Sequence, residues 1–84
     1  MSAEQSAKEA LAVRNKVMME NYDKILRDVE EIQNHILPDY LNATPDAREK
    51  NQIFKKWNPM VLDLTNGLAI LSQGIEATFK VIKG

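Results

Sequence analysis

Residues 57–82 read WNPMVLDLTNGLAILSQGIEATFKVI, and this stretch decides the fold. Seven large apolar side chains and one threonine recur along it at alternating spacings of four and three residues: Trp57, Val61, Leu64, Leu68, Leu71, Ile75, Thr78 and Ile82. A mean spacing of about 3.5 residues places all of them in one stripe along an α-helix. The stretch therefore predicts a long amphipathic helix that packs against another helix.

The first half of the chain carries a matching stripe. From Met18 onward its members again alternate by four and three: Met18, Tyr22, Ile25, Val29, Ile32 and Ile36, with Leu11 further upstream. Pro38 disfavours helical geometry at Leu37, so a first helix is expected over about residues 5–37. Two unlike stripes joined by a short link predict an all-α fold, an antiparallel two-helix hairpin.

Residues 38–44 are expected to form the turn. Tyr40, Leu41 and Asn42 lie at its centre, and Asn42 is the residue there that best tolerates a left-handed conformation. Thr44 is a suitable N-cap with Pro45 at the first helical position, because proline has no N–H to leave unpaired there. The second helix is then expected over about residues 45–82.

Pro59 lies inside the second stripe. Its ring clashes with the preceding turn and it donates no backbone hydrogen bond. Because the stripe keeps its phase across Pro59, we expect a kinked helix, and a break between Trp57 and Met60 is the alternative.

Composition excludes several classes of protein. The chain has 84 residues, which predicts one domain over residues 1–84, and it has no cysteine for a disulfide or a thiolate metal site. A net charge of -1 argues against a nucleic-acid partner. The most apolar segment, residues 60–82, is interrupted by polar residues, so no stable membrane insertion is expected. The N-terminus lacks the pattern of a cleavable signal peptide, which predicts a cytosolic protein or export by a leaderless route.

No residue pattern points to catalysis, a cofactor or a metal. His35 is the single histidine, and a histidine near a helix end usually interacts with the helix terminus. Glu30 and Glu31 are acidic neighbours without an accompanying Glu-x-x-His motif, so we interpret them as a solvated face. The sequence therefore predicts a non-enzymatic protein.

Apolar side chains are not balanced between the two arms. With a turn centred at Leu41 and Asn42, residue i faces about residue 83 minus i, so the apolar end of the second helix faces the alanines of residues 1–8. A helix that is apolar on more than one face is usually buried on more than one face. We therefore expect a protein partner, either a second hairpin completing a four-helix bundle or many copies in a larger helical assembly.

Eight residues of the second helix are the predicted assembly interface: Trp57, Leu64, Leu68, Ile70, Leu71, Ile75, Phe79 and Ile82. Opposite net charges on the arms, -4 over residues 1–46 (nine acids, five bases) and +3 over residues 47–84 (three acids, six bases), favour antiparallel docking. A charge on the outer face, as in Ile70→Glu, is expected to weaken association more than folding.

The second helix resembles the W-x-G helical hairpins of type VII secretion, the early secretory antigenic target-like family. Trp57 followed by Asp63-Leu64-Thr65-Asn66-Gly67-Leu68, then Leu71 and Ile75, is similar to the pattern that follows the turn in that family. The resemblance covers most of residues 40–82. It implies a homodimeric or heterodimeric four-helix bundle, exported without a leader by a dedicated secretion machinery, or an export partner of another protein.

Two positions depart from that family. Tyr40-Leu41-Asn42 stands where W-x-G is expected, and the C-terminal Tyr-x-x-x-Asp/Glu signal would fall at Phe79 to Lys83, where the acid is missing. These departures put direct recognition by the export machinery in doubt, although a partner could carry the signal. The implied location is the cytoplasm before export, and afterwards the cell surface or the medium.

Two other interpretations remain open. The chain is also similar to type III secretion needle subunits in Thr44-Pro45-Asp46, Gln52, Trp57 and the apolar end at residues 79–82, but it lacks the Leu-Leu after the turn and the Lys-Asp of helix 2 of that family. Such a subunit polymerises into a filament. The third interpretation is a small cytosolic chaperone or adaptor that shields a helix of its partner.

Overall fold

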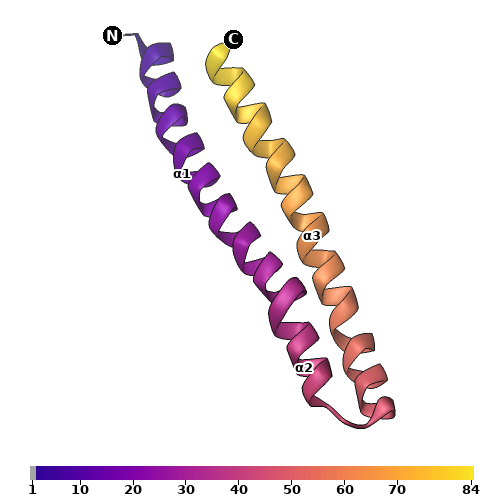
Figure 1. Ribbon diagram of the computed structural model, residues 1–84. Helices are drawn as coiled ribbons and strands as arrows, with labels where there is room; N and C mark the ends of the chain where they lie inside the picture. The colour runs from indigo at the N-terminus through magenta and orange to yellow at the C-terminus, as the bar shows by residue number, and fades with distance from the viewer. Residues whose placement is uncertain (1) are drawn as a thin grey trace.

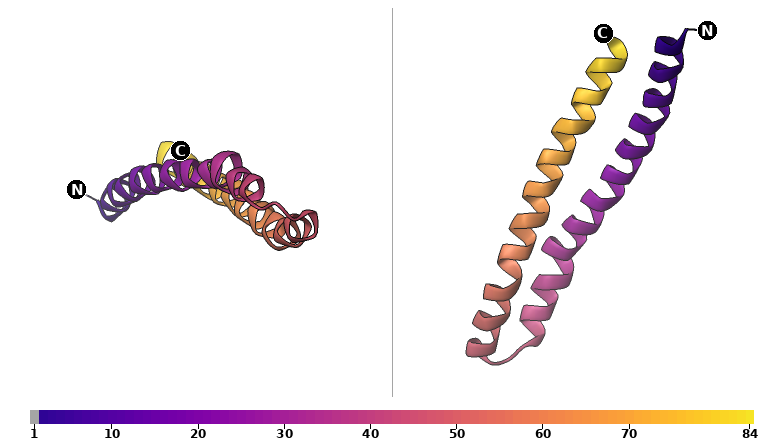
Figure 2. Two further views of the ribbon diagram at one scale, coloured as in Figure 1. Left: turned by 60° about the horizontal axis from the view of Figure 1, so that its bottom comes forward. Right: turned by 180° about the vertical axis from the view of Figure 1, so that it is seen from behind.

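The computed structural model describes residues 2–84, and every element in them is helical. Helix α1 (Ala3–Glu31) continues through a π-helical turn η1 (Ile32–Ile36) into α2 (Leu37–Ala43), and α3 (Ala47–Lys83) returns alongside. Both termini lie at one end of the molecule, opposite the link (Figures 1 and 2). The all-α hairpin expected from the two stripes is confirmed.

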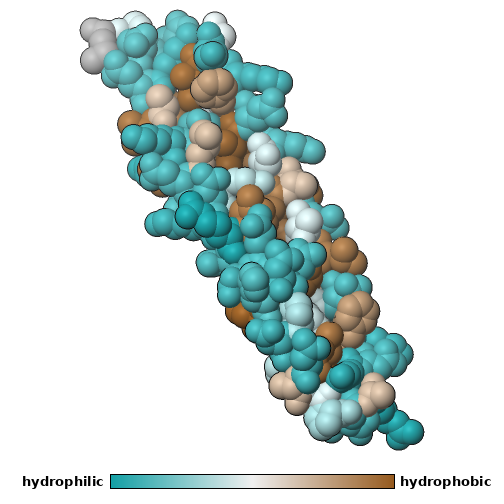
Figure 3. Space-filling view, viewed as in Figure 1, coloured by the Kyte–Doolittle hydropathy of each residue, from teal (hydrophilic) through white to brown (hydrophobic). Residues whose placement is uncertain are grey.

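The hairpin is a single elongated layer measuring 66 × 16 × 14 Å. Nothing covers either of its two broad faces. Figure 3 shows apolar patches along the length of one face, between hydrophilic margins. Within residues 2–84, no helix is both long and apolar enough to cross a membrane.

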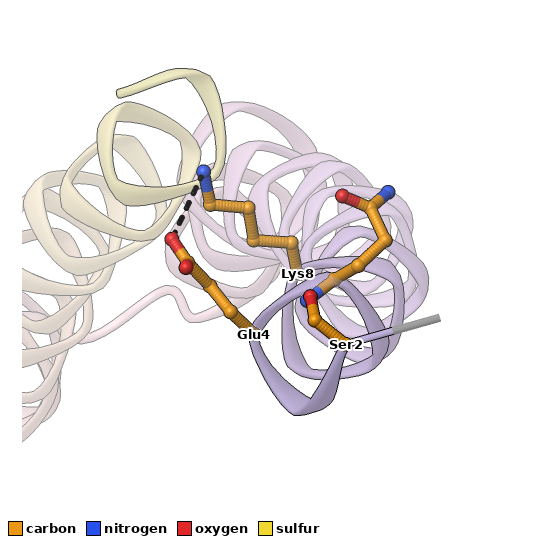
Figure 4. Close-up of polar contacts among 4 residues, drawn as sticks. Ser2, Glu4 and Lys8 are labelled. Carbon is orange, nitrogen blue, oxygen red and sulfur yellow. Dashed lines mark hydrogen bonds and ion pairs between the residues drawn. The ribbon is translucent and has the colours of Figure 1, made fainter.

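The N-terminus of α1 is capped locally (Figure 4). The Ser2 hydroxyl accepts a hydrogen bond from the backbone N–H of Gln5, at 3.2 Å. Lys8 and Glu4, one helical turn apart, form an exposed ion pair at 3.9 Å. Such a cap satisfies one free N–H of the first turn, whereas an exposed pair at this spacing adds little to stability.

Pro38 does not end the first helical arm, contrary to the expected stop near Leu37. The chain inserts the π-helical turn Ile32–Ile36 just before it, and the Leu37 N–H bonds to the carbonyl of Ile32. A π-turn holds one more residue than an α-turn, which relieves the crowding that a proline ring causes in the preceding turn. The arm therefore remains helical to Ala43, and Tyr40, Leu41 and Asn42 are helical rather than part of the turn.

The π-turn also changes which side chains face α3. The inserted residue delays the helical phase by one position. As a result Ile36, a member of the predicted stripe, is exposed, while Leu37 and Leu41 are half-buried.

The link between the arms is three residues, 44–46, in place of the predicted 38–44. Thr44 is the C-cap of α2, and its hydroxyl donates to the carbonyl of Tyr40 at 3.0 Å. The N-cap of α3 is Asp46, whose carboxylate accepts from the backbone N–H of Arg48 at 2.8 Å, so the assignment of Thr44 as N-cap and Pro45 as first helical residue is wrong. An ionised carboxylate makes the stronger bond at the positive end of a helix. Among the described residues none has a positive φ, so Asn42 is not left-handed.

Pro59 neither ends nor interrupts α3, which rules out the alternative of a break. The longer first arm moves the pairing register, because the link now centres on residue 45. Asn15 donates to the carbonyl of Ile75, so residue i faces about residue 90 minus i, one heptad away from the expected pairing. Phe79 and Ile82 consequently face Leu11 and Lys8 rather than the alanines at the start of α1.

The core between the arms is thin. Its buried hydrophobic residues are Val29, Val61, Leu68 and Ile75, at 5–8% exposure, and no side chain in residues 2–84 is less than 2% exposed. The half-buried side chains of both stripes surround these four. In a two-helix layer each helix has one neighbour, so only the side chains that point directly at the other arm are buried.

Leu68→Ala tests this core at its centre, because Leu68 is 7% exposed. We expect the free energy of unfolding to fall by about 2–3 kcal/mol, the lower part of the range for buried leucines, since a thin core collapses into the space easily. Urea unfolding at fixed protein concentration, followed by circular dichroism, measures the loss. Ile70→Ala, two residues away and exposed, is the control and should change stability by less than about 0.5 kcal/mol.

Candidate assembly surface

The structure divides the eight predicted interface residues into two groups. Leu68 and Ile75 are buried between the arms, and Trp57 and Ile82 are half-buried there. Leu64, Ile70, Leu71 and Phe79 are exposed, Ile70 at 68% and Phe79 at 45%. The first group stabilises the hairpin itself, and the second is available to a partner.

Exposed apolar side chains are also present elsewhere on both arms. Beyond the predicted set, the large ones are Leu11, Val13, Val17, Met19, Ile25, Ile36, Tyr40, Phe54, Met60, Leu62 and Val81. Isolated exposed apolar residues are normal on proteins, whereas a contiguous group on one face marks an interaction site. The position of these residues around the helices therefore decides their meaning.

Two hollows lie between the arms. The open-end hollow, about 330 Å³, is lined by Met19, Tyr22, Asp23, Ser72, Ile75, Glu76 and Phe79. The turn-end hollow, about 370 Å³, is lined by Gln33, Pro38, Leu41, Asn42, Phe54, Trp57, Asn58 and Val61. Each has an apolar floor contributed by both arms, and the open-end hollow has two carboxylates in its lining.

Both hollows open on the same broad face. In a helix of about 3.6 residues per turn, steps of seven and eleven residues return to nearly the same direction. Phe54, Val61, Ser72 and Phe79 are separated by seven, eleven and seven residues, and Tyr22 and Gln33 by eleven. We call this side the groove face. Ile70, nine residues before Phe79, points half a turn away from it.

An aromatic pair stands at the turn-end hollow. The rings of Phe54 and Trp57 pack edge to face with centroids 6.1 Å apart. The indole N–H of Trp57 is buried and has no hydrogen-bond partner, while Phe54 remains 48% exposed. Trp57, one of the eight predicted interface residues, is thus half-buried within its own hairpin. Phe54, which the stripe analysis missed, is the ring of this pair that reaches solvent.

Asn15 is the buried polar residue of the core, at 5% exposure. Its side-chain N–H donates to the Ile75 carbonyl at 2.9 Å, linking the two arms across 60 residues of sequence. The signal was present in the sequence, since Asn15 lies four residues after Leu11 and three before Met18 and so continues the heptad stripe. A polar residue at such a position specifies pairing register at a cost in stability.

The residues considered for chemistry, Glu30, Glu31 and His35, are all exposed. His35 lies exposed in the π-helical turn, and the described part of the chain contains no group of three or more His, Asp or Glu residues arranged to hold a metal ion. The sequence matches no protein-family model, no curated protein and no solved structure.

Two substitutions at Asn15 distinguish its effect on the pairing register of the two arms from its effect on the free energy of unfolding. Asn15→Ala should lower the free energy of unfolding by about 1 kcal/mol, the usual net value of one hydrogen bond. Asn15→Leu should be as stable as the native chain or more so, because an apolar side chain of similar size needs no partner. Asn15→Leu should also allow the two arms to pair in more than one register.

Spin labels on Glu9→Cys and Lys80→Cys, which are exposed and lie at about the same level of the two arms, measure the register in a chain that has no other cysteine. We expect one narrow distance distribution with Asn15 and a broadened or double one with Asn15→Leu. An unchanged narrow distribution would show that packing alone sets the register.

Proposed function

We propose that this chain is a non-enzymatic assembly protein that functions by packing against a second helical hairpin to form a four-helix bundle. The observation that carries the proposal is the exposure of large apolar side chains on a hairpin that has already buried what two helices can bury. Phe54 and Phe79, for example, are 48% and 45% exposed. Complete burial of such a side chain contributes about 1.5–3 kcal/mol, so docking a second layer has a large driving force.

Stability supports the same proposal. Fixing the backbone of one residue costs about 1–2 kcal/mol, and a small domain needs a substantial core to offset that cost. This hairpin has four buried hydrophobic residues within residues 2–84. Small proteins with neither disulfides nor metals commonly complete their core by oligomerisation.

We further propose that the assembly belongs to bacterial protein secretion of the type VII, W-x-G-like kind. Support comes from the hairpin architecture, from the Trp57 and Asp63-to-Leu68 pattern on α3, and from the position of that pattern after the link. In this role the protein is exported by a dedicated secretion machinery, or it accompanies an exported partner, and it reaches the cell surface or the medium from the cytoplasm.

The oligomeric state of the purified protein tests the assembly. Sedimentation equilibrium should give twice the chain mass of 9.6 kDa, and dilution should lower the melting temperature, because partner binding stabilises the folded form by mass action. Long filaments would favour the needle-subunit interpretation instead, and a pair formed only with a co-expressed neighbour would favour the adaptor. A folded monomer at millimolar concentration, with no change in melting temperature on dilution and no pairing with a co-expressed neighbour, would contradict all three.

A further inference from the structure

We infer that the partner is a second copy of this chain, docked on the groove face in an antiparallel arrangement, with Phe54 of each copy seated in the open-end hollow of the other. The inference rests on the proposed assembly and adds which face is used, which copy fills it and in which direction. The inference is argued from three features of the groove face, which are the projecting side chain of Phe54, the open-end hollow and the charged residues beside each of them.

Phe54 is the projecting group. It is half exposed at the rim of the turn-end hollow, and its edge-to-face contact with Trp57 fixes the direction of its ring. A rigid aromatic side chain that is held in place before binding loses little conformational entropy when it docks, which is why such residues anchor interfaces.

The open-end hollow is the receiving site. Met19, Tyr22, Ile75 and Phe79 supply apolar and aromatic lining from both arms, and its volume of about 330 Å³ accommodates a phenyl ring with room for adjustment. The hollow lies on the same face as Phe54 but at the other end of the hairpin. One surface therefore carries both complementary parts, as a two-fold interface between identical copies requires.

Charge selects the antiparallel direction. Asp23 and Glu76 give the open-end hollow an acidic lining, and Lys55 follows Phe54 directly. We place the two-fold axis in the interface, crossing the hairpins near the level of Thr65. Lys55 lies ten positions before Thr65 and Glu76 lies eleven positions after it. The axis therefore brings Lys55 of one copy opposite Glu76 of the other. Glu76 already has a loose, exposed contact with Lys80 at 3.6 Å, which leaves it accessible.

The parallel arrangement lacks these matches. It places the open-end hollow against its own copy, so the hollows stay unfilled and the carboxylates of Asp23 and Glu76 face one another. Like charges brought together across an interface oppose that arrangement, and charge complementarity fixes orientation more than it adds affinity.

The available area agrees with a stable dimer. A face of 66 × 16 Å offers roughly 1,000 Å² per copy, which exceeds the ~800 Å² per partner of an ordinary specific interface. Ile70, which the stripe analysis placed in the interface, lies on the opposite side of α3 and stays in water in this arrangement. The inference therefore departs from the expectation that a charge at Ile70 weakens association, and Ile70 provides a control for exposed apolar surface in general.

The first experiment compares Phe54→Ser with Ile70→Ser by sedimentation equilibrium. Phe54→Ser removes an aromatic anchor from both symmetry-related contacts, so it should weaken dimerisation by at least about 30-fold, while loss of Ile70 should change it by less than about threefold. Both residues are exposed, and circular dichroism verifies that each variant is helical. The opposite result, with Ile70→Ser dissociating the dimer and Phe54→Ser associating like the native chain, would overturn the groove-face inference and leave the proposed assembly standing.

The second experiment exchanges charges. Lys55→Glu alone and Glu76→Lys alone should each weaken self-association by about threefold to tenfold, because each homodimer then has two like-charged pairs. Mixing the two variants restores both opposite-charge pairs, so they should form heterodimers in preference to either homodimer, as measured by native mass spectrometry. The matched control mixes Glu76→Lys with Lys56→Glu, whose side chain leaves the helix about 100° away and toward the other face.

Equal heterodimer formation in the Lys55 and Lys56 mixtures would contradict the antiparallel register. A native chain that remains monomeric at millimolar concentration would refute this inference, and it would refute the proposed assembly as well if no co-expressed hairpin pairs with it. The oligomeric state of the native chain, alone and with a co-expressed hairpin, therefore separates failure of the assembly from failure of the face or the direction.

Discussion

The structure depends on one limit, the amount of surface that two helices can remove from water when each has a single neighbour. Only the strip of each arm that points at the other is buried, and four hydrophobic side chains lie fully inside it. The rest of a broad apolar surface remains exposed on a layer 66 Å long. Shape, thin core and unfilled hollows all follow from this limit, and so does the case for a partner.

Polar contacts define geometry that the small core does not define, namely how the two arms pair and how the link between them is held. Packing of a regular heptad stripe against another is nearly periodic, so a shift by one heptad changes few contacts. Asn15 adds one directed contact to that packing, because its side-chain N–H donates to the Ile75 carbonyl of the other arm. Asp46 at the start of α3 and the Thr44 hydroxyl at the end of α2 fix the link in the same local way.

The two internal prolines are accommodated differently. Before Pro38 the chain inserts a π-helical turn, which shifts the phase of everything that follows and turns Leu37 inward in place of Ile36. Pro59 is absorbed within α3, where the stripe continues on both sides without a shift. A proline in a helical pattern thus has two structural outcomes, and the phase of the apolar residues beyond it distinguishes them.

Sequence by itself determined the helical class, the two arms and the antiparallel hairpin. The spacing of apolar residues along each arm reflects local helix geometry, which does not depend on how the other arm packs. The sequence also determined the apolar surplus of α3, which composition alone makes visible. The tertiary structure decided the register, the extent of the first arm and the identity of the exposed residues. These depend on a single π-turn, whose cost is set by packing against α3, and on one hydrogen bond between residues 60 positions apart. The tertiary structure also decided the position of the hollows and the exposure of the Phe54 ring, because a groove between two helices exists only when the helices pack against each other.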